Sequence, residues 1–364
     1  MSDIDVAGAL GEHFALDVRE VVPIGEGTDR AATVWKVQVP SGRAYAVKWT
    51  SGGSPAGLVL SSVLAAVRPD TTPASATRGA PAPELDGAPA PELDGAPAPE
   101  PDGAPAPVRT RAGALWATVA GRRLSVVEWL PGRSAAESAP TSEHWVAFGR
   151  LLSALHGLPL DDELRRWLPR EDFDPSRWAA AFDRVDAALD RAPDRGEDGC
   201  LTRLAALWRQ RRDDLRGVRE RTVRAGRSLS ARAGDVRIVP CHGDAHVGNL
   251  VLTGADTVAL LDFDDCVLAP PERDLMFVLG GGVFPGRLVT PEQQEAFLRG
   301  YGAHATDDRL LSYYRGLRVL EDVADPAAVV LDTTAAQAQR SDNLGYVAAT
   351  LAPGGLLDQA LGVG

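Results

Sequence analysis

The stretch HGDAHVGN at residues 242–249, followed by LDFDD at residues 261–265, decides how this chain is interpreted. The first follows an apolar run at residues 236–240 and the second follows TVALL at residues 257–261, so each begins where a short buried strand is predicted to end. Buried carboxylates are costly unless they are paired or bind a cation. The two acidic stretches therefore predict a functional site rather than a packing motif.

The spacing of these polar residues suits phosphoryl transfer with a magnesium ion. Asp244 could accept or orient the proton of an incoming hydroxyl group, and Asn249 offers a neutral oxygen to Mg²⁺. Asp262 would be a hard, anionic ligand for the same ion and would connect it to the phosphates. We therefore predict that Asp244 is the catalytic residue and that Asn249 and Asp262 are the metal ligands.

Toward the N-terminus, two further features suit a bound nucleotide. The sequence IGEGTDR at residues 24–30 predicts a tight turn between strands, and its backbone N–H groups, near Gly25, Gly27 and Thr28, could approach phosphates. Lys48 stands in the next predicted hairpin, where its ammonium group could hold the phosphates that are not transferred. Each feature is common when taken alone, and their order before the acidic stretches is what favours a nucleotide site.

Alternation and turn residues predict a β-rich first part and a helical second part. Strands are expected at residues 20–24, 33–39, 43–49, 114–120 and 122–130. Helices are expected at residues 55–68, 142–158, 175–192, 201–227, 291–302 and 308–323. Ser142 is a plausible N-cap and Gly157 a plausible stop of the second helix.

A proline-rich repeat interrupts the β-rich part. Its copies are GAPAPELD at 79–86 and 87–94, GAPAPEPD at 95–102 and the truncated GAPAP at 103–107. This composition predicts a solvated linker over residues 71–107, inserted into an N-terminal nucleotide-binding lobe of residues 1–130. Residues 131–364 are expected to form a catalytic and acceptor-binding lobe.

Composition narrows the class of partner and the compartment. The chain has 364 residues and a net charge of −12, so it lacks the basic surplus that nucleic-acid binding requires. Three cysteines do not build a disulfide framework, and no signal peptide or membrane span is evident. We therefore expect a cytoplasmic protein that binds neither nucleic acid nor membrane.

The order of the glycine turn, Ala-Val-Lys48, His-Gly-Asp244-x-x-x-x-Asn249 and Asp262-Phe-Asp resembles the aminoglycoside phosphotransferase and choline kinase superfamily, the small-molecule relatives of protein kinases. The resemblance covers nearly the whole chain except the linker. It implies an α+β, bilobal, protein-kinase-like fold, with a small β-rich lobe and a larger helical lobe. It also implies ATP and Mg²⁺ as cofactors, Asp244 as the catalytic aspartate, Asn249 and Asp262 as the metal ligands, and Lys48 as the phosphate-binding lysine.

The same resemblance implies a hinge and a class of acceptor. Glu128, Trp129 and Leu130 fall where the family's hinge lends backbone groups to the adenine. The run from Asp262 to Phe277 looks more like that of spectinomycin-type phosphotransferases than that of choline kinases. The implied acceptor is a small-molecule hydroxyl, for example on an aminoglycoside or aminocyclitol antibiotic; choline, homoserine or a sugar are alternatives.

The chain departs from the kinase pattern beside Lys48. Kinases pair the strand lysine with a glutamate on the next helix, but the helix predicted at residues 55–68 holds no acidic residue, and the first glutamate afterwards is Glu84. Either the pair is made elsewhere or Lys48 meets the phosphates without that partner. A nucleotide-binding pseudokinase is therefore an alternative.

Other polar residues have more than one interpretation. His242 and His246 could bind zinc in a metal-dependent hydrolase, although structural roles in the loop are favoured. Asp274 is expected to cap or anchor the following helix. Five residues late in the chain fit either an acceptor pocket or core packing: Tyr313, Tyr314, Arg318, Glu321 and Asp322.

Overall fold

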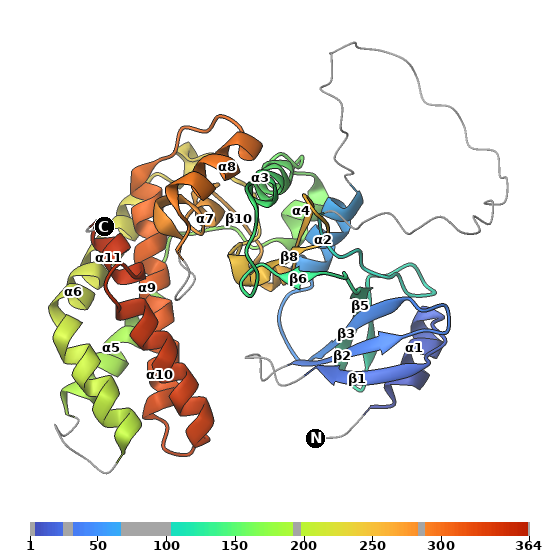
Figure 1. The fold of residues 1–364 in the computed structure, drawn as a ribbon, viewed down its shortest axis with the longest axis horizontal. Coiled ribbons are helices and arrows are strands. Elements are labelled where there is room, and N and C mark those ends of the chain that lie inside the picture. Colours follow the sequence, from blue (N-terminus) through green and yellow to red (C-terminus); the bar gives the residue numbers. More distant parts are fainter. Residues whose placement is uncertain (1–3, 25–31, 67–102, 192–197, 283–287, 363–364) are drawn as a thin grey trace.

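The computed structural model describes residues 4–24, 32–66, 103–191, 198–282 and 288–362 and arranges them in two lobes (Figure 1). The smaller lobe contains the N-terminal sheet, and the larger lobe contains most of the helices. Three residues of the predicted phosphate turn, Gly25, Gly27 and Thr28, lie outside the described residues.

An antiparallel sheet in the order β1-β2-β3-β5-β4 forms the smaller lobe. Its strands are β1 (Glu20–Ile24), β2 (Ala32–Gln38), β3 (Ala44–Thr50), β4 (Trp116–Val119) and β5 (Arg122–Glu128). Burial alternates along β3, where Tyr45, Val47 and Trp49 form a core with the helix α1 (Val6–Phe14). Because side chains alternate between the two faces of a strand, Lys48 lies on the face away from this core.

The helix α2 (Ala56–Ala66) follows β3 in sequence but packs with the larger lobe. Its buried residues Val59, Leu60 and Leu64 belong to the main hydrophobic core of the helical lobe, and the sheet with α1 has a separate core. Figure 1 shows α2 between the sheet and the helical lobe, close to α4 (Asp162–Trp167).

The last copy of the repeat connects the two lobes. Gly103 pairs with β9 (Val258–Leu260) of the larger lobe through two backbone hydrogen bonds of 2.8 and 3.1 Å. Pro107 then forms a bridge with β5 of the sheet. Residues 103–107 are therefore part of the folded structure, whereas residues 71–102 of the expected linker lie outside the described residues.

Two small sheets of the larger lobe carry the acidic stretches. Strand β8 (Leu250–Leu252) pairs with β6 (Arg133–Ser134) and with β9, and β7 (Val239–Cys241) pairs with β10 (Val267–Ala269). As the sequence predicts, HGDAHVGN begins directly after β7 and LDFDD directly follows β9.

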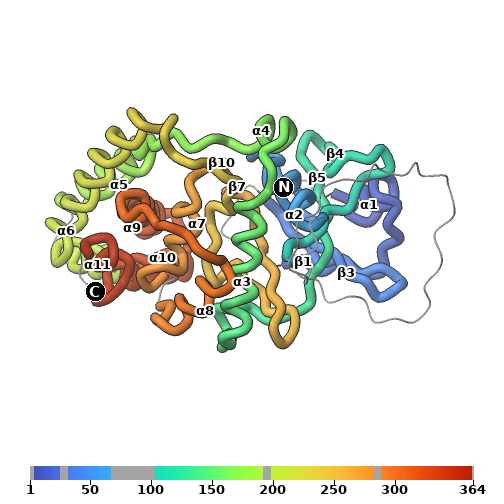
Figure 2. The backbone as a smooth tube through the Cα atoms, turned by 90° about the horizontal axis from the view of Figure 1, so that it is seen from above, coloured from blue at the N-terminus to red at the C-terminus, as the bar shows by residue number. Residues whose placement is uncertain are grey.

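Helices make up the rest of the larger lobe (Figure 2). They are α3 (Ser142–His156), α4, α5 (Ser176–Asp190), α6 (Gly199–Ser230), α7 (Glu272–Leu275), α8 (Pro291–Tyr301), α9 (Asp308–Leu331), α10 (Gln337–Leu351) and α11 (Leu356–Leu361). The sequence analysis did not predict α1, α4, α7, α10 or α11. Helix α9 packs against α5, α6, α7, α10 and α11 and so forms the centre of the lobe.

Helix α9 is longer than predicted. It was expected to end at residue 323, before Pro326, but it continues to Leu331. Proline removes a helical hydrogen bond and crowds the preceding turn. Val323, Ala327 and Val330 are buried on both sides of it. Burial of this apolar face therefore outweighs the local cost of the proline.

The predicted N-cap of α3 is wrong by one residue. Thr141, rather than Ser142, caps the helix, because its hydroxyl accepts the His144 N–H at 3.4 Å. The His144 ring accepts the Thr141 N–H in return at 3.0 Å. The stop at Gly157 is confirmed.

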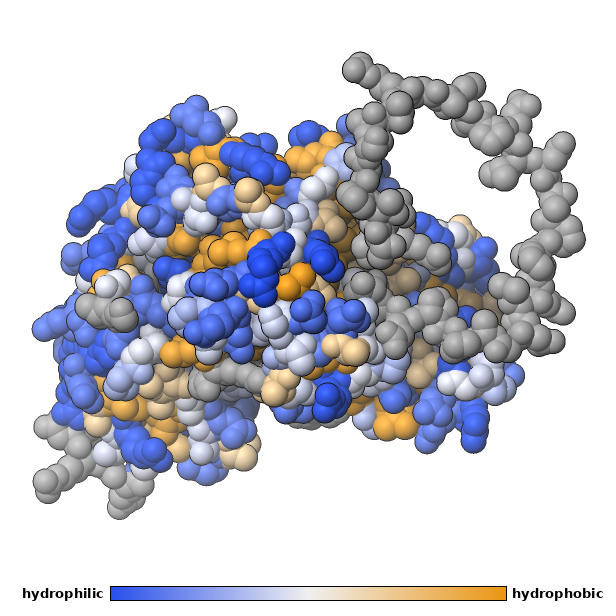
Figure 3. All heavy atoms as spheres, turned by 45° about the horizontal axis from the view of Figure 1, so that its top comes forward, coloured by the Kyte–Doolittle hydropathy of each residue, from blue (hydrophilic) through white to orange (hydrophobic). Residues whose placement is uncertain are grey.

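Apolar side chains on the surface are dispersed. Figure 3 shows separate hydrophobic patches among hydrophilic residues on the face it presents. Across the described residues, no helix combines the length and apolarity needed to cross a membrane.

Candidate active site

The β8–β9 hairpin brings the two predicted metal ligands to one end of a small sheet. Leu250 pairs with Leu260, and beyond this pair the Leu261 N–H donates to the carbonyl of Asn249 at 2.8 Å. Asn249 directly precedes β8 and Asp262 follows the end of β9. The two residues therefore lie next to each other at the same end of the hairpin. Their oxygens are the hard ligands that magnesium prefers, so the donor set fits the predicted ion.

Hydrogen bonds fix Asn249 relative to Asp244. The Asn249 Nδ2 donates to the Asp244 carbonyl at 2.9 Å and to its carboxylate at 3.0 Å. This leaves Oδ1 as the oxygen through which Asn249 could bind a metal. Asp244 and Asn249 are thus hydrogen-bonded to each other, and the backbone bond of Leu261 places the neighbouring Asp262 beside Asn249.

Asp274 holds the loop that carries Asp244. Its side chain is fully buried and accepts the N–H groups of His242 and Gly243, both at 2.7 Å. It was expected to cap or anchor the following helix, but the N-cap of α7 is Pro271 and no side chain caps it. The sequence gives no signal for this contact, because it joins residues that are distant in the chain.

Asp274 also belongs to a buried group with His156 and Cys241, whose polar atoms all lie within 4.8 Å of one another. The Nε2 of His156 lies 3.0 Å from Asp274. Burial raises the pKa of the Cys241 thiol well above its usual value, and the thiol donates to the Ala269 carbonyl at 3.5 Å. Asp274 and His156 also hydrogen-bond other protein groups, the loop N–H groups and the Tyr301 hydroxyl, so we assign this group a structural role.

Gly243 allows the two acidic loops to touch. Its φ angle of +84° is in the left-handed region, and a Cβ at this position would collide with the backbone carbonyl of Asp265. Any other residue would be strained and would push the loops apart. The glycine therefore sets the distance between Asp244 and the acidic turn Phe263–Asp265.

The structure confirms a structural role for His242. The Asp244 N–H donates to its Nδ1 at 3.2 Å, and its Nε2 lies 2.8 Å from the Leu261 carbonyl. Burial lowers the pKa of His242, which favours the neutral ring. Both ring nitrogens have protein partners, so neither is available to bind zinc. A zinc site would then have His246 as its only histidine from this loop.

Asp244 is held in its charged form. Its carboxylate lies 2.9 Å from the Arg318 guanidinium and 3.3 Å from His246 Nε2. Burial opposes ionisation, but the hydrogen bond with His246 and the charge of Arg318 outweigh it, so the pKa of Asp244 lies well below its usual range. The Asp244 carboxylate is therefore charged at neutral pH and can accept a hydrogen bond.

Helix α9 contributes more charged groups near Asp244. The Arg318 Nε lies 2.8 Å from Asp322, one helical turn away. Burial raises the pKa of both Glu321 and Asp322, while Arg318 opposes this effect. Glu321 and Asp322 therefore lie with Arg318 near Asp244, the predicted catalytic residue.

Tyr313 and Tyr314, on the same helix, belong to the core instead. They are 1% and 0% exposed and pack with Phe173 at ring distances of 5.8 and 6.5 Å. The residues that recur at helical spacing in this segment therefore include both core residues and charged residues near Asp244. Sequence periodicity alone could not separate them, because both kinds recur at the same interval.

Lys48 reaches the acidic turn from the smaller lobe. Its ammonium group forms an ion pair with Asp264, the middle aspartate of LDFDD. Asp262 itself has a left-handed backbone with φ of +62°. Its pKa is raised first by burial and then by the charge of Asp264, and lowered by Lys48. A cation at this position would relieve the repulsion between the two carboxylates.

The predicted hinge lies at the end of β5, where some backbone groups already have partners. The Glu128 N–H donates to Ala106, and the Trp129 N–H donates to Ala44, both at 3.0 Å. The Trp129 ring also lies under the Lys36 ammonium group, 4.4 Å from its centroid. The backbone groups that could still bind the adenine, as the hinge prediction requires, are therefore the carbonyl of Glu128 and the N–H of Leu130.

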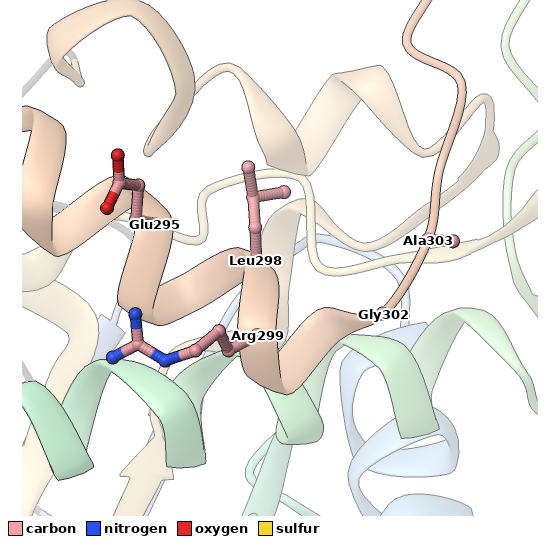
Figure 4. Close-up of a pocket in the computed structure, with 5 residues that line it drawn as sticks. All are labelled: Glu295, Leu298, Arg299, Gly302 and Ala303. Carbon is pink, nitrogen blue, oxygen red and sulfur yellow. The ribbon is translucent and has the colours of Figure 1, made fainter.

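A separate hollow on the surface lies away from this site (Figure 4). It is lined by Glu295, Leu298 and Arg299 of α8 and by Gly302 and Ala303, which follow this helix. None of the predicted site residues lines it.

Comparison with protein families gives a match over more than half of the chain. The family described as the phosphotransferase enzyme family matches residues 78–320. A search of curated protein sequences finds no significant match.

Several solved structures have a similar fold at low sequence identity. A spectinomycin phosphotransferase, APH(9)-Ia, in complex with ADP and spectinomycin, is 19% identical with a TM-score of 0.75, covering 100% of this chain and 98% of that one. The amicoumacin kinase hAmiN is 15% identical with a TM-score of 0.56, covering 96% and 93%. The macrolide 2'-phosphotransferase MphH from Brachybacterium faecium is 14% identical with a TM-score of 0.51, covering 94% and 96%. These likenesses confirm the expected bilobal, kinase-like fold.

Proposed function

Because the chain belongs to the phosphotransferase enzyme family, we propose that it transfers the γ-phosphate of ATP to a hydroxyl group of a small molecule, with Asp244 as the catalytic residue. The observation that carries this proposal is the hydrogen bond between Asn249 and Asp244, with Asp262 held beside Asn249 by the backbone of Leu261. The three buried, unpaired cysteines are in keeping with our proposal of a cytoplasmic location.

The residues divide the work of an in-line transfer. Mg²⁺, when held by Asn249 and Asp262, would neutralise the charge of the β- and γ-phosphates. Lys48 would hold the phosphates that are not transferred. The hydrogen bonds from Asn249 and the ion pair with Arg318 orient the Asp244 carboxylate, which would accept the hydrogen bond of the acceptor hydroxyl and align it. Glu128 and Leu130 would contact the adenine, and the N–H groups near Gly25, Gly27 and Thr28 would cover the phosphates.

The acidic face of α9 favours an acceptor that carries a positive charge. Burial of Glu321 and Asp322 raises their pKa, and a nearby cation would stabilise their charged forms. Proteins with this fold include kinases of spectinomycin and amicoumacin. We therefore propose a cationic hydroxyl compound of the aminocyclitol or aminoglycoside type as the acceptor.

A pseudokinase is not favoured by these contacts. A protein that only binds nucleotide would not need Asp244 to be held in its charged form by His246 and Arg318.

The direct test is magnesium-dependent release of ADP from ATP in the presence of a panel of acceptors. Spectinomycin and other aminocyclitols and aminoglycosides come first, followed by choline, homoserine and simple sugars. We expect one cationic acceptor to stimulate release. Asp244→Asn should reduce this stimulated rate on the order of 10² to 10⁴-fold.

Asp183→Asn is the matched control, because Asp183 is a half-exposed aspartate in an ion pair with Arg219 on the far helices of the larger lobe. It should turn over as the wild type does. Near-normal turnover by Asp244→Asn would contradict the proposed catalytic role.

A further inference from the structure

We propose that Asp264 is the positioning residue for Lys48 and takes the place of the helix glutamate that this chain lacks. The inference rests on the proposed function, because it assigns a partner to the lysine that would hold the nucleotide phosphates. It adds a residue of the acidic turn to the nucleotide site of the smaller lobe.

The ion pair itself is the first observation. The Lys48 ammonium group contacts the Asp264 carboxylate across the boundary between the two lobes. The side chains of Lys48 and Asp264 are 29% and 56% exposed, so solvent and a ligand can reach the pair. The alternation of β3 already directs Lys48 to the face of the sheet away from α1. The carboxylate thus meets a lysine whose direction the strand has set.

Helix α2 cannot supply that carboxylate. Its sequence AGLVLSSVLAA contains no acidic residue, and its inward positions are apolar or small. Ser61, the polar residue that is buried there, donates to the carbonyl of Pro105 instead. A kinase of this type needs its strand lysine held in place for phosphate binding, so another element has to do this.

The packing of α2 explains how the acidic turn comes within reach. A Cβ at Gly57 would lie 2.6 Å from the carbonyl oxygen of Phe263 and 2.9 Å from its carbon. Backbone atoms cannot move aside as the end of a flexible side chain can. Only glycine lets α2 lie directly on the turn Phe263–Asp265, and Asp264 of this turn contacts Lys48 of β3.

The charge of Asp264 also acts on a second cation of the smaller lobe. Burial lowers the pKa of Arg123 on β5, and the charge of Asp264 opposes this effect. Asp264 therefore faces two cations of the smaller lobe, Lys48 and Arg123.

The test is the affinity of the full-length protein for ADP, measured by calorimetry with Mg²⁺ and again with a chelator. ADP carries the phosphates that Lys48 would hold. Asp264→Asn should weaken ADP binding about fivefold in both conditions, as expected for a half-exposed ion pair. Lys48→Met should weaken it more. In the Lys48→Met background, Asp264→Asn should have no further effect, because a positioning residue acts through its partner.

Two further variants separate this role from a general loss of structure. Asp264→Glu keeps the carboxylate and should restore most of the affinity. Asp183→Asn removes a carboxylate of similar exposure, 51%, from the Arg219 pair and should bind ADP as the wild type does. Thermal unfolding of every variant checks that each one is folded.

Each other outcome overturns the inference in a distinct way. Tighter ADP binding by Asp264→Asn would mean that Asp264 competes with phosphate for Lys48. A loss seen only with Mg²⁺ would make Asp264 a metal ligand, and an unchanged affinity, or an equal loss in the Lys48→Met background, would show that it does not act through Lys48. In these cases acceptor-dependent ADP release by the wild type would still support the proposed function. If the wild type does not bind ADP, both this inference and the proposed function are wrong.

Discussion

At the scale of single residues, Asp262 combines an unusual backbone conformation with a proposed metal-binding role. Its φ of +62° is unfavourable for most side chains but is tolerated by aspartate and asparagine. The Asp262→Asn variant should therefore fold normally, but it would lack the negative charge of this proposed metal ligand. We expect acceptor-stimulated ADP release to fall by about 100-fold or more. Titration of the rate with Mg²⁺ checks this, because weaker binding of the ion should shift the curve to higher concentration.

Arg318 is the residue whose effect should appear in a pH profile. The pKa of Asp244 is lowered in the folded protein, so its charged form adds stability above the unfolded pKa of about 4 and loses this contribution as the pH falls further. Removing the guanidinium in Arg318→Met should raise the pKa of Asp244. We expect the acidic limb of kcat/KM to move to higher pH.

Arg219→Met, which breaks the distant pair with Asp183, is the control for this profile and should leave the limb in place. A fall in kcat/KM with an unmoved limb would show that Arg318 acts on the acceptor rather than on the charge of Asp244.

At the scale of elements, the contact between the two acidic loops depends on Gly243. In Gly243→Ala, the methyl group adds left-handed strain and a collision with the backbone of Asp265. We expect a loss of about 2–3 kcal/mol in the free energy of unfolding, with loss of turnover. Denaturant unfolding measures the first effect.

Gly42 provides a matched control. Its φ of +87° is almost the same, but nothing lies within 4 Å of the position of a Cβ. Gly42→Ala should therefore cost only the strain, about 1 kcal/mol. Equal losses in the two variants would show that the collision at Gly243 contributes nothing.

The elements also show how far the sequence predicts this structure. Strand alternation and turn residues located the five strands of the sheet to within two residues at each end, and the acidic stretches follow the strands from which they were expected to begin. The extension of α9 past Pro326 was missed, because its burial depends on other helices. The contact of Asp274 with the loop was missed for the same reason. Local patterns predict local structure, and long-range packing decides the rest.

The partner of Lys48 illustrates the same limit within the site. The sequence shows that α2 has no acidic residue, and so the absence of the usual pair was predictable. The replacement was not, because Asp264 lies 216 positions further along the chain. Only the close packing of α2 on the acidic turn brings the two side chains together.

At the scale of the whole molecule, the repeat provides an internal control for the connection between lobes. Ala104 and Ala96 occupy the same position in two copies of the sequence GAPAP. Ala104 is 8% exposed and lies between the Gly103 pairing with β9 and the bridge at Pro107. The composition of the copy that contains Ala96 predicts a solvated linker.

We therefore expect different effects from the same substitution. Ala104→Asp would bury an unpaired charge and should lower the free energy of unfolding by about 2 kcal/mol or more. Ala96→Asp should leave it unchanged, and both can be measured by denaturant unfolding of the full chain. If neither variant changes the free energy of unfolding, another copy of GAPAP can take the place of residues 103–107. The copies are identical over these five positions. In that case the contact between the lobes would require any one copy of GAPAP, and its contribution to the free energy of unfolding would not depend on the copy at residues 103–107.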